Sequence, residues 1–371
     1  MERGTKGPGS RPPVSGRSVT IRDVARELEL SITTVSRALN GYPDVGERTR
    51  KRVAEVAQRL GYRPNRNAQR LVTRRTHNIA WVQQDNDRKF VDPHFVEVMA
   101  GVLRGARASN YDIVLASETP EHEMSVYDRF VNDNSVDGFI VDLPRENDRR
   151  VSFLLEAGRP FVVHGRDGRT AQYGWVDIDN YGNFYNLARL LIANGHRHIA
   201  FVNGDEAFTY ALYRRRAVAD AVADGGLPQD SVRVYNSLHP MGDAGYKLTT
   251  LALSDPLVTA ILYSSTLMAV EGHAAVVRSG RRQVAVATMD DGLHYLDLSP
   301  FAGQFTRVCS SLREAGGAVI AELIRQCNEP GPGRGVEIAS TFELAHGVDG
   351  TVLNQPIPSR RRQTQRRLQP A

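Results

Sequence analysis

The sequence contains little cysteine and no long apolar run. Its 371 residues include two cysteines, Cys309 and Cys327, which are too few for a disulfide framework or a cysteine-built metal site. No stretch approaches the roughly 18 apolar residues that a membrane helix needs, and the N-terminal residues lack the apolar core of a secretory signal. We therefore expect a protein of a reducing cytoplasm, with no membrane span, metal or other cofactor.

Motifs of common enzymes are also missing. The chain has no G-x-x-x-x-G-K-[ST] phosphate loop, no G-x-G-x-x-G after a predicted strand and no G-x-S-x-G nucleophile turn. His196 and His198 precede a predicted strand and are too close together for a metal pair on one helix face, so we interpret them as structural. These absences favour a binding protein over an enzyme.

The charge is distributed unevenly along the chain. Residues 1–76 carry 17 Lys and Arg against 7 Asp and Glu, whereas residues 77–356 carry 25 against 35 and residues 357–371 carry five arginines and no acid. A basic N-terminal segment on an acidic body indicates that this segment binds a polyanion while the body does something else. With 41% apolar residues, the chain can form two or three domains with cores.

The basic segment has the pattern of three short helices. Residues 20–30, TIRDVARELEL, place apolar side chains at helical spacing behind Thr20, a predicted N-cap. A second helix is predicted at 32–40 with Ser31 as its N-cap, and a third at 47–60. Two short helices joined by a turn of a few residues form a helix-turn-helix, whose second helix can enter the major groove of DNA.

The motifs T-I-R-D-V-A-R, T-V-S-R-A-L-N-G, R-T-R-K-R-V and L-G-Y-R-P-N follow one another in this segment. In residues and spacing they resemble the lactose-repressor (LacI/GalR) family of bacterial transcription regulators over residues 19–76, and the resemblance continues more loosely to about residue 350. It implies a homodimeric repressor that binds double-stranded DNA at a palindromic operator and that a small sugar releases.

The resemblance also implies which residues contact DNA. Base reading falls on Ile32, Thr33 and Arg37, since an arginine can bond O6 and N7 of guanine and an isoleucine can pack on a thymine methyl group. The residues better placed for the DNA backbone are Thr20, Ser31, Thr34, Ser36, Asn40 and Tyr62. After Pro64 the family has a hinge helix that binds the minor groove, and its expected contacts are Asn65, Ala68, Arg70 and Leu71. An ordinary flexible linker is the alternative.

From residue 77 onward, short apolar runs alternate with amphipathic stretches, which predicts parallel sheets covered by helices on both faces. The segments HNIAWVQQD, from residue 77, and HRHIAFVNGD, from residue 196, indicate an internal duplication. We therefore expect an all-α helix-turn-helix head and an α/β core of two doubly wound parallel-sheet lobes, as in periplasmic binding proteins. The resemblance implies three chain crossings between the lobes, near residues 178, 307 and 333.

The expected domain limits follow from these patterns. They are a disordered N-terminal arm at 1–17, the head at 18–62, the hinge helix and linker at 63–76, an effector-binding and dimerisation domain at 77–352 and a basic disordered tail at 353–371. Within the effector-binding domain, lobe 1 is expected at about 77–177 and 308–332, and lobe 2 at about 178–307 and 333–352.

Ligand contacts are expected just after strands, because ligands of doubly wound sheets bind outside the carboxyl ends of the strands. The resemblance implies a sugar between the lobes, and the candidate contacts are His94, Phe95, Arg166, Asp179, Tyr210, Arg214 and Asp290. Arg214 and Asp290 would offer a polyol a donor and an acceptor, although an ion pair between the two is the alternative.

The choice of effector rests on shorter strings. H-G-R at 164–166, the turn W-V-D-I-D-N and the run Y-R-R-R resemble repressors of α-glucoside utilisation. A purine or nucleoside and a sugar phosphate are the alternative effectors, and a ligand-binding protein without regulatory DNA binding is the alternative function.

Overall fold

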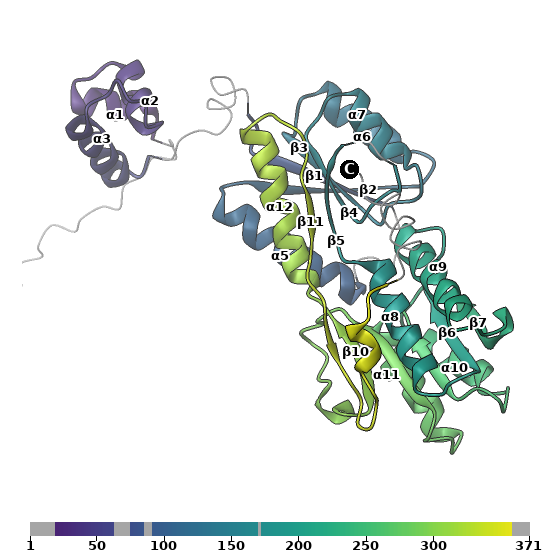
Figure 1. Cartoon of the computed structure of the whole chain (residues 1–371). Coiled ribbons are helices and arrows are strands. Elements are labelled where there is room, and N and C mark those ends of the chain that lie inside the picture. The colour runs from purple at the N-terminus through teal and green to yellow at the C-terminus, as the bar shows by residue number, and fades with distance from the viewer. Residues whose placement is uncertain (1–18, 63–74, 85–90, 170–171, 358–371) are drawn as a thin grey trace, which may run out of the picture. The chain divides into compact units, whose positions relative to one another are not determined.

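The computed structural model describes residues 19–62, 75–84, 91–169 and 172–357 (Figure 1). The chain divides into two compact units, Met1–Thr76 and His77–Ala371. The expected N-terminal arm, residues 358–371 of the expected tail and the four expected hinge contacts, Asn65, Ala68, Arg70 and Leu71, lie outside the described residues. No helix in the described ranges combines the length and the apolar character that a membrane crossing requires.

The first unit is a bundle of three helices, α1 (Ile21–Leu28), α2 (Ile32–Leu39) and α3 (Glu47–Leu60). The predicted N-caps are confirmed: Thr20 donates to the Asp23 carboxylate from its backbone nitrogen and its hydroxyl, over 2.9 and 2.7 Å, and the Ser31 hydroxyl accepts from the Thr34 backbone nitrogen. One buried apolar cluster joins the helices, formed by Val24, Ala25, Leu28, Val35, Ala38, Val45, Val53 and Ala57.

The second unit begins with a parallel sheet in the order β11-β5-β4-β3-β1-β2. Its strands are β1 (Asn78–Gln84), β2 (Asp112–Glu118), β3 (Gly138–Asp142), β4 (Phe161–His164), β5 (Gly174–Asp177) and β11 (Gly335–Glu337). Its helices are α5 (Pro93–Ala108), α6 (Glu123–Asn132), α7 (Arg149–Glu156) and α12 (Leu312–Asn328). An apolar cluster under α5 and α12 and another under α6 and α7 bury both faces of the sheet, and this is lobe 1 (Figure 1).

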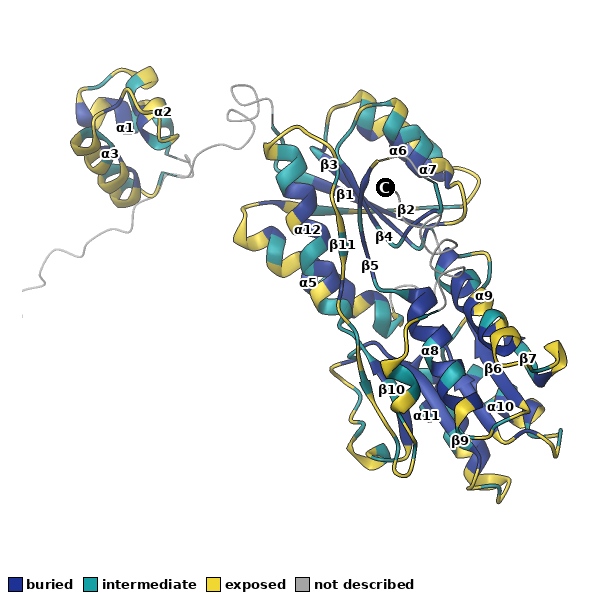
Figure 2. Ribbon diagram, in the orientation of Figure 1, coloured by how far each residue is buried: buried dark blue, intermediate teal, exposed yellow. Residues whose placement is uncertain are grey.

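Lobe 2 is a second sheet in the order β12-β10-β9-β8-β6-β7. Its strands are β6 (Ile199–Asn203), β7 (Val232–Asn236), β8 (Ala260–Tyr263), β9 (Ala285–Asp290), β10 (Phe305–Cys309) and β12 (Thr341–Glu343). Its helices are α8 (Asn180–Ala193), α9 (Thr209–Asp224), α10 (Ala244–Ala252) and α11 (Thr266–Arg278), with short 3-10 helices at Gln229–Ser231, Ser299–Phe301 and Thr351–Asn354. The central strands β6, β8 and β9 are buried on both faces (Figure 2), whereas the edge strands β7 and β12 are largely intermediate or exposed.

The predicted fold class is confirmed, with one addition. The strands of lobe 2 are parallel except that β12 pairs antiparallel with β10 at the edge of the sheet. The apolar runs that predict strands, at 79–82, 113–116, 138–141, 160–163, 199–203, 259–263 and 284–289, correspond to β1–β4, β6, β8 and β9. The strands β5, β7, β10, β11 and β12 were not among them, because short or partly polar segments carry too little periodic signal.

The first two chain crossings lie close to the expected positions, and the third differs. The first follows Asp177, where β5 of lobe 1 ends, close to the expected residue 178. The second follows Cys309, where β10 ends, close to the expected residue 307. The third follows Glu337 and not residue 333, because β11 first pairs with β5 and so belongs to lobe 1.

The start of the expected disordered tail is ordered instead. Residues 353–357 belong to the described part of the chain, and the backbone oxygen of Gln355 accepts a 2.9 Å hydrogen bond from Arg189 of α8. Ile357 packs against the apolar cluster under α8 and α9. This contact with a helix more than 160 residues away could not be deduced from the polar composition of the tail.

Candidate functional site

The two lobes enclose a cavity of about 810 Å³. Residues at or just after the carboxyl ends of strands from both sheets line it, as expected for doubly wound sheets. From lobe 1 these include Gln83, Gln84, Asp142, His164 and Asp177, and from lobe 2 Ser264, Ser265 and Asp291. The volume is in the range of cavities that bury small organic ligands.

Arg214 of α9 is a firmly anchored cation in this cavity. Its Nε donates to Oδ1 of Asn180 over 2.8 Å, and its Nη1 donates to the backbone oxygen and the hydroxyl of Ser264 over 2.6 and 2.9 Å. The guanidinium carbon also lies 4.6 Å from the ring centre of Phe184 and 5.0 Å from that of Tyr210. Nη2 bonds to no described residue, so Arg214 can donate to a ligand oxygen from a fixed position.

The pKa of Arg214 is lowered from its ordinary value, chiefly because burial removes the charge from water, while the Asp291 carboxylate acts in the opposite direction. An arginine nevertheless stays protonated at every physiological pH. The cavity therefore holds a buried positive charge whose bonded partners, Asn180 and Ser264, are neutral. A ligand hydroxyl or other oxygen acceptor would meet it without displacing a carboxylate.

His94 connects the two lobes. It follows the N-cap of α5 in lobe 1, and its Nδ1 lies 2.9 Å from Oδ1 of Asp92, while its Nε2 lies 3.4 Å from Oδ2 of Asp291 in lobe 2. Burial alone would lower the pKa of His94, but the carboxylates of Asp291 and Asp92 outweigh it and raise the pKa to about 10. His94 is thus a cation at neutral pH and pairs with a carboxylate of each lobe.

The raised pKa of His94 predicts a pH-dependent stability. Because the pKa is about 10 in the folded protein and 6.5 in the unfolded chain, the stabilisation is fully present below pH 6.5 and is lost as the pH rises through 10. The melting temperature of the wild type should exceed that of His94→Gln most at about pH 6, and the difference should shrink toward pH 10. Thermal unfolding at several pH values measures this, with His239→Gln at an exposed cavity residue as the control. A difference that stays constant over this range would contradict the prediction.

Three further contacts bridge the lobes. The backbone nitrogen of Thr209 donates to the backbone oxygen of Pro144 over 3.0 Å, Glu146 pairs with Arg216 at 3.1 Å, and Glu97 pairs with His294 at 3.0 Å. The lobes are therefore held together by polar contacts, each of which a change in their relative angle would stretch or break.

The structure brings four of the expected ligand contacts to the cavity. His94, Phe95, Tyr210 and Arg214 all line it. Phe95 is buried and packs against Trp81, with ring centres 5.0 Å apart at a tilt of 53°, so it serves the core as well. Burial raises the pKa of Tyr210 to about 12, so its hydroxyl remains protonated.

Asp290, Arg166 and Asp179 were expected at the ligand, but none of them lines the cavity. Asp290 pairs with Arg307 of β10 at 2.9 Å, and its neighbour Asp291 faces the cavity instead, because consecutive residues at a strand end point in different directions. Asp179 caps α8, accepting a 2.7 Å hydrogen bond from the backbone nitrogen of Gly182. The alternative of an ion pair between Arg214 and Asp290 is also wrong, since Arg307 takes that carboxylate.

Arg166 lies at the first chain crossing and not at the cavity. Its Nε donates to Oδ2 of Asp177 over 3.0 Å, its Nη2 donates to the backbone oxygen of Ile178, and its guanidinium carbon lies 4.6 Å from the ring centre of Trp175. Asp177, which the sequence reasoning missed, reaches the cavity in its place.

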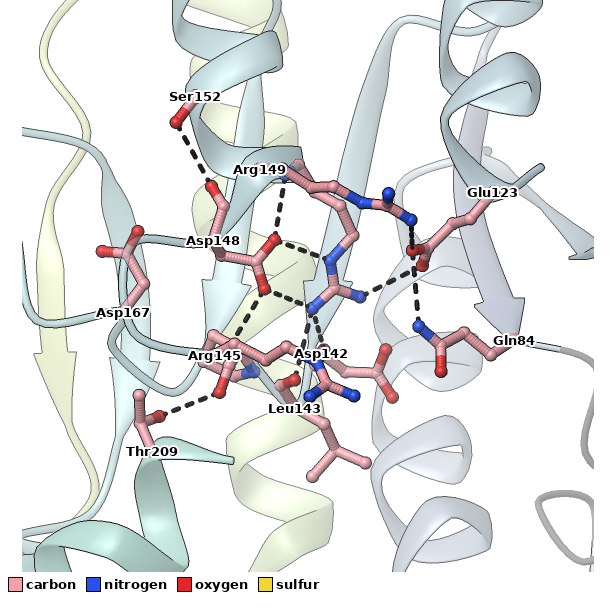
Figure 3. Close-up of polar contacts among 12 residues, drawn as sticks. Gln84, Glu123, Asp142, Leu143, Arg145, Asp148, Arg149, Ser152, Asp167 and Thr209 are labelled. Carbon is pink, nitrogen blue, oxygen red and sulfur yellow. Dashed lines mark hydrogen bonds and ion pairs between the residues drawn. The ribbon is translucent and has the colours of Figure 1, made fainter. Parts of the chain in front are cut away.

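A polar wall in lobe 1 was also missed. Figure 3 shows it around Asp148, which caps α7 and binds Arg150 at 2.8 Å, while Arg150 also donates to the backbone oxygen of Asp142 over 3.0 Å. Glu123, at the start of α6, lies 3.4 Å from both Gln84 and Arg149. Gln84 and Asp142 are the last residues of β1 and β3. The expectation that ligand contacts lie at or just after strand ends could therefore have identified them. No group of three or more potential metal ligands exists among the residues that the structure describes.

In the head, α2 places the expected base-reading residues on its exposed side. Ile32, Thr33 and Arg37 are exposed, whereas Val35 and Ala38 are buried. Ile32 is 45% exposed, an unusual position for so large an apolar side chain unless something covers it. Arg37 pairs with Asp44 at 2.8 Å, and both side chains are about half exposed.

The expected DNA-backbone contacts have local partners. Thr20 and Ser31 cap helices, the Thr34 hydroxyl lies 2.8 Å from that of Ser31, and Asn40 donates to the backbone oxygen of Ser36 over 2.9 Å. Tyr62 packs half-buried against the core of the head. The contacts of Ser31, Thr34 and Asn40 lie at the two ends of α2, beside its exposed face, whereas Thr20 caps α1 and Tyr62 follows α3.

A helix-turn-helix head and a two-lobed unit with a ligand-sized interlobe cavity together define a transcriptional regulator with a ligand-binding domain. Comparison with known protein families identifies the family to which this regulator belongs. Residues 20–65 match the bacterial regulatory proteins of the lacI family, and residues 76–311 match the periplasmic binding proteins and sugar binding domain of the LacI family. The chain belongs to the lacI family of bacterial regulatory proteins, and it is a DNA-binding transcriptional regulator.

Individual relatives agree with this assignment. The HTH-type transcriptional regulator AglR of Rhizobium meliloti (strain 1021) is 39% identical over 311 residues, which cover 82% of this chain and 87% of AglR. The structure of a transcriptional regulator CelR–cellobiose complex is 25% identical with a TM-score of 0.61, covering 88% of this chain and 98% of CelR. The lac repressor dimer bound to operator and the anti-inducer ONPF shares the fold, with a TM-score of 0.73 at 19% identity over 88% of this chain and 98% of that one. The prediction of a regulator rather than an enzyme is confirmed by these relatives.

Proposed function

We propose that this protein is a repressor that binds a palindromic operator as a homodimer and that a small neutral sugar, an α-glucoside, releases it. The observation that carries the proposal is the interlobe cavity with a fixed arginine, Arg214, and a carboxylate, Asp291, on its wall. Such a donor and acceptor suit the adjacent hydroxyls of a sugar. We place the protein in the cytoplasm, associated with the nucleoid when it is bound to DNA.

The charges of the cavity support a neutral ligand. Among the described residues that line it, nine are Asp or Glu, whereas four are Arg and His94 is a fifth cation. A sugar phosphate would bring at least one further negative charge into this acidic surrounding, where like charges repel. A neutral sugar is the better fit of the two.

The aromatic rings of the cavity give less support to a purine. Phe208 and Tyr210 line it, but the guanidinium of Arg145 lies 5.0 Å from the ring centre of Phe208 and that of Arg214 lies 5.0 Å from the ring centre of Tyr210. One face of each ring is therefore taken by a cation. A flat base would have to compete with these contacts.

The preference for glucosides rests on similarity. The strings H-G-R and Y-R-R-R suggest an α-glucoside, and the CelR structure is a complex with cellobiose, a disaccharide of glucose. Cellobiose has a β linkage, so the linkage is the point that an experiment has to decide.

In this proposal the exposed face of α2 reads the operator through Ile32, Thr33 and Arg37. The segment with Asn65, Ala68, Arg70 and Leu71 acts as the hinge helix in the minor groove. Sugar binding changes the angle between the lobes, which separates the two hinges of the dimer and lowers the affinity for the operator. By thermodynamic linkage the operator must lower the affinity for the sugar by the same factor.

The test starts from operator fragments selected with the purified protein from its own genomic DNA. Fluorescence anisotropy then measures operator affinity with added maltose, trehalose, cellobiose, glucose 6-phosphate or hypoxanthine. We expect an α-linked disaccharide to weaken operator binding, and calorimetry to show the reciprocal loss of sugar affinity. If glucose 6-phosphate or hypoxanthine releases the operator instead, that compound class replaces the sugar as the effector. If a sugar tightens operator binding, the sugar is a co-repressor. If the protein selects no DNA sequence, the result supports a ligand-binding protein without regulatory DNA binding.

A further inference from the structure

A continuous chain of buried polar contacts runs from the first crossing to the cavity. Arg166 donates to Asp177 over 3.0 Å, and the other oxygen of the Asp177 carboxylate accepts from the side-chain amide of Asn180 over 2.9 Å. The side-chain oxygen of Asn180 accepts from Nε of Arg214 over 2.8 Å, and Arg214 ends on Ser264. Each of these five side chains is less than a tenth exposed.

The chain of contacts joins the two lobes at the segments where the chain crosses between them. Arg166 and Asp177 belong to lobe 1, and Asn180 and Arg214 belong to lobe 2. Asp177 ends β5 just before the first crossing, and its backbone oxygen accepts a 2.8 Å hydrogen bond from the backbone nitrogen of Ile338 on the third crossing. Asp177 thus contacts the third crossing through its backbone oxygen, and its carboxylate leads through Asn180 to the arginine of the cavity.

The Nη1 atom of Arg166 is buried and donates a hydrogen bond to no described residue. An unbonded buried donor costs free energy, and structures seldom retain one without a role. Asp179 on the first crossing and Glu337 just before the third are close enough to act electrostatically on Arg166.

We propose that Arg166 is a positioning residue for the ligand site, which holds Arg214 in place through Asp177 and Asn180 and couples it to the angle between the lobes. Arg166 does not touch the ligand. It fixes the orientation of the Asp177 carboxylate, which selects the orientation of the Asn180 amide that accepts from Arg214. The inference rests on the proposed sugar binding, since Arg214 is the residue whose position is at stake.

The first experiment does not need a sugar. The Nε–H signal of Arg214 is identified by its loss in Arg214→Lys, and its exchange with water is measured by NMR in the full-length protein. We expect Arg166→Gln to accelerate this exchange about tenfold, because the Asn180 oxygen no longer keeps its orientation. The matched control is Arg159→Gln, since Arg159 binds Asn134 and Val136 on the other side of lobe 1. Unchanged exchange in Arg166→Gln would overturn the proposal.

The second experiment uses the sugar that releases the operator. Arg166→Gln should raise the sugar Kd about tenfold, and Arg166→Lys, which keeps a donor, should restore part of the affinity. Combined with Arg214→Lys, the loss should be clearly smaller than the product of the two single losses, because both variants break the same chain of contacts. Multiplicative losses would assign Arg166 an independent structural role. If no sugar binds the wild type, the proposed function fails while the exchange measurement still decides the positioning role.

Discussion

Replacing Arg214 by lysine is expected to weaken sugar binding about 100-fold, equivalent to about 2.8 kcal/mol. A guanidinium bonds Asn180 and Ser264 at the same time and still presents Nη2 to the cavity, whereas a single ammonium cannot reproduce this fixed fork. Operator affinity without sugar should stay unchanged, since the head is a separate compact unit. The variant should therefore remain on the operator at sugar concentrations that release the wild type.

The matched control for Arg214→Lys is Arg215→Lys on the next residue of α9. Arg215 pairs with Glu206, is about half exposed and does not line the cavity, so its replacement should alter sugar affinity less than twofold. Calorimetry with the sugar and anisotropy with the operator measure the two effects. Because the lysine leaves a buried acceptor unbonded, we also expect a stability loss of about 1–3 kcal/mol, so binding is measured well below the melting temperature. Sugar affinity equal to that of the wild type would exclude Arg214 from the ligand site.

Replacing Arg37 by alanine is expected to cost about 1–3 kcal/mol on the selected operator and little on random DNA, since a bidentate arginine–guanine contact is worth about that much. In the free head, Arg37 binds Asp44 through Nη2 at 2.8 Å and Nε at 3.2 Å and lies 5.0 Å from the ring centre of Tyr42. An exposed ion pair of this kind contributes at most about 1 kcal/mol. Arg37 therefore loses little free energy when it leaves Asp44 to bind a guanine.

Asp44→Asn is the control that tests whether Asp44 competes with the operator for Arg37. It removes the negative charge that holds Arg37 and a repulsion from the DNA phosphates, so operator affinity should stay the same or rise. Anisotropy with operator and random duplexes at fixed salt measures both variants. Equal losses on the two duplexes for Arg37→Ala would show that Arg37 contacts phosphates and reads no base.

The helices of the head could be predicted closely because their signals are local. Thr20 reaches Asp23 and Ser31 reaches Thr34, each within one helical turn, so the cap, the acceptor and the apolar spacing are all written in neighbouring residues. The alternation of apolar runs and amphipathic stretches likewise predicted the two doubly wound lobes. The cavity at the carboxyl ends of the strands followed from this class of fold.

The candidate ligand site could be predicted only in part. His94 and Arg214 reach the cavity from their expected positions, but the exchange of Asp290 for Asp291 depends on Arg307, a residue of the neighbouring strand β10. A sequence string gives the residue type and approximate place of a ligand contact. It does not tell which of two adjacent carboxylates a neighbouring strand will take.

The sequence by itself determined the DNA-binding head, the class of fold and the general place of the ligand, since each depends on local periodicity, caps and residue type. Only the tertiary structure decided that Arg166 binds Asp177 instead of the ligand, that the third crossing lies beyond Glu337 and that Ile357 packs on lobe 2. In each case the deciding partner is a side chain or strand brought close by folding. Hydrogen bonds and ion pairs depend on distances of a few ångströms, which spacing along the chain does not specify.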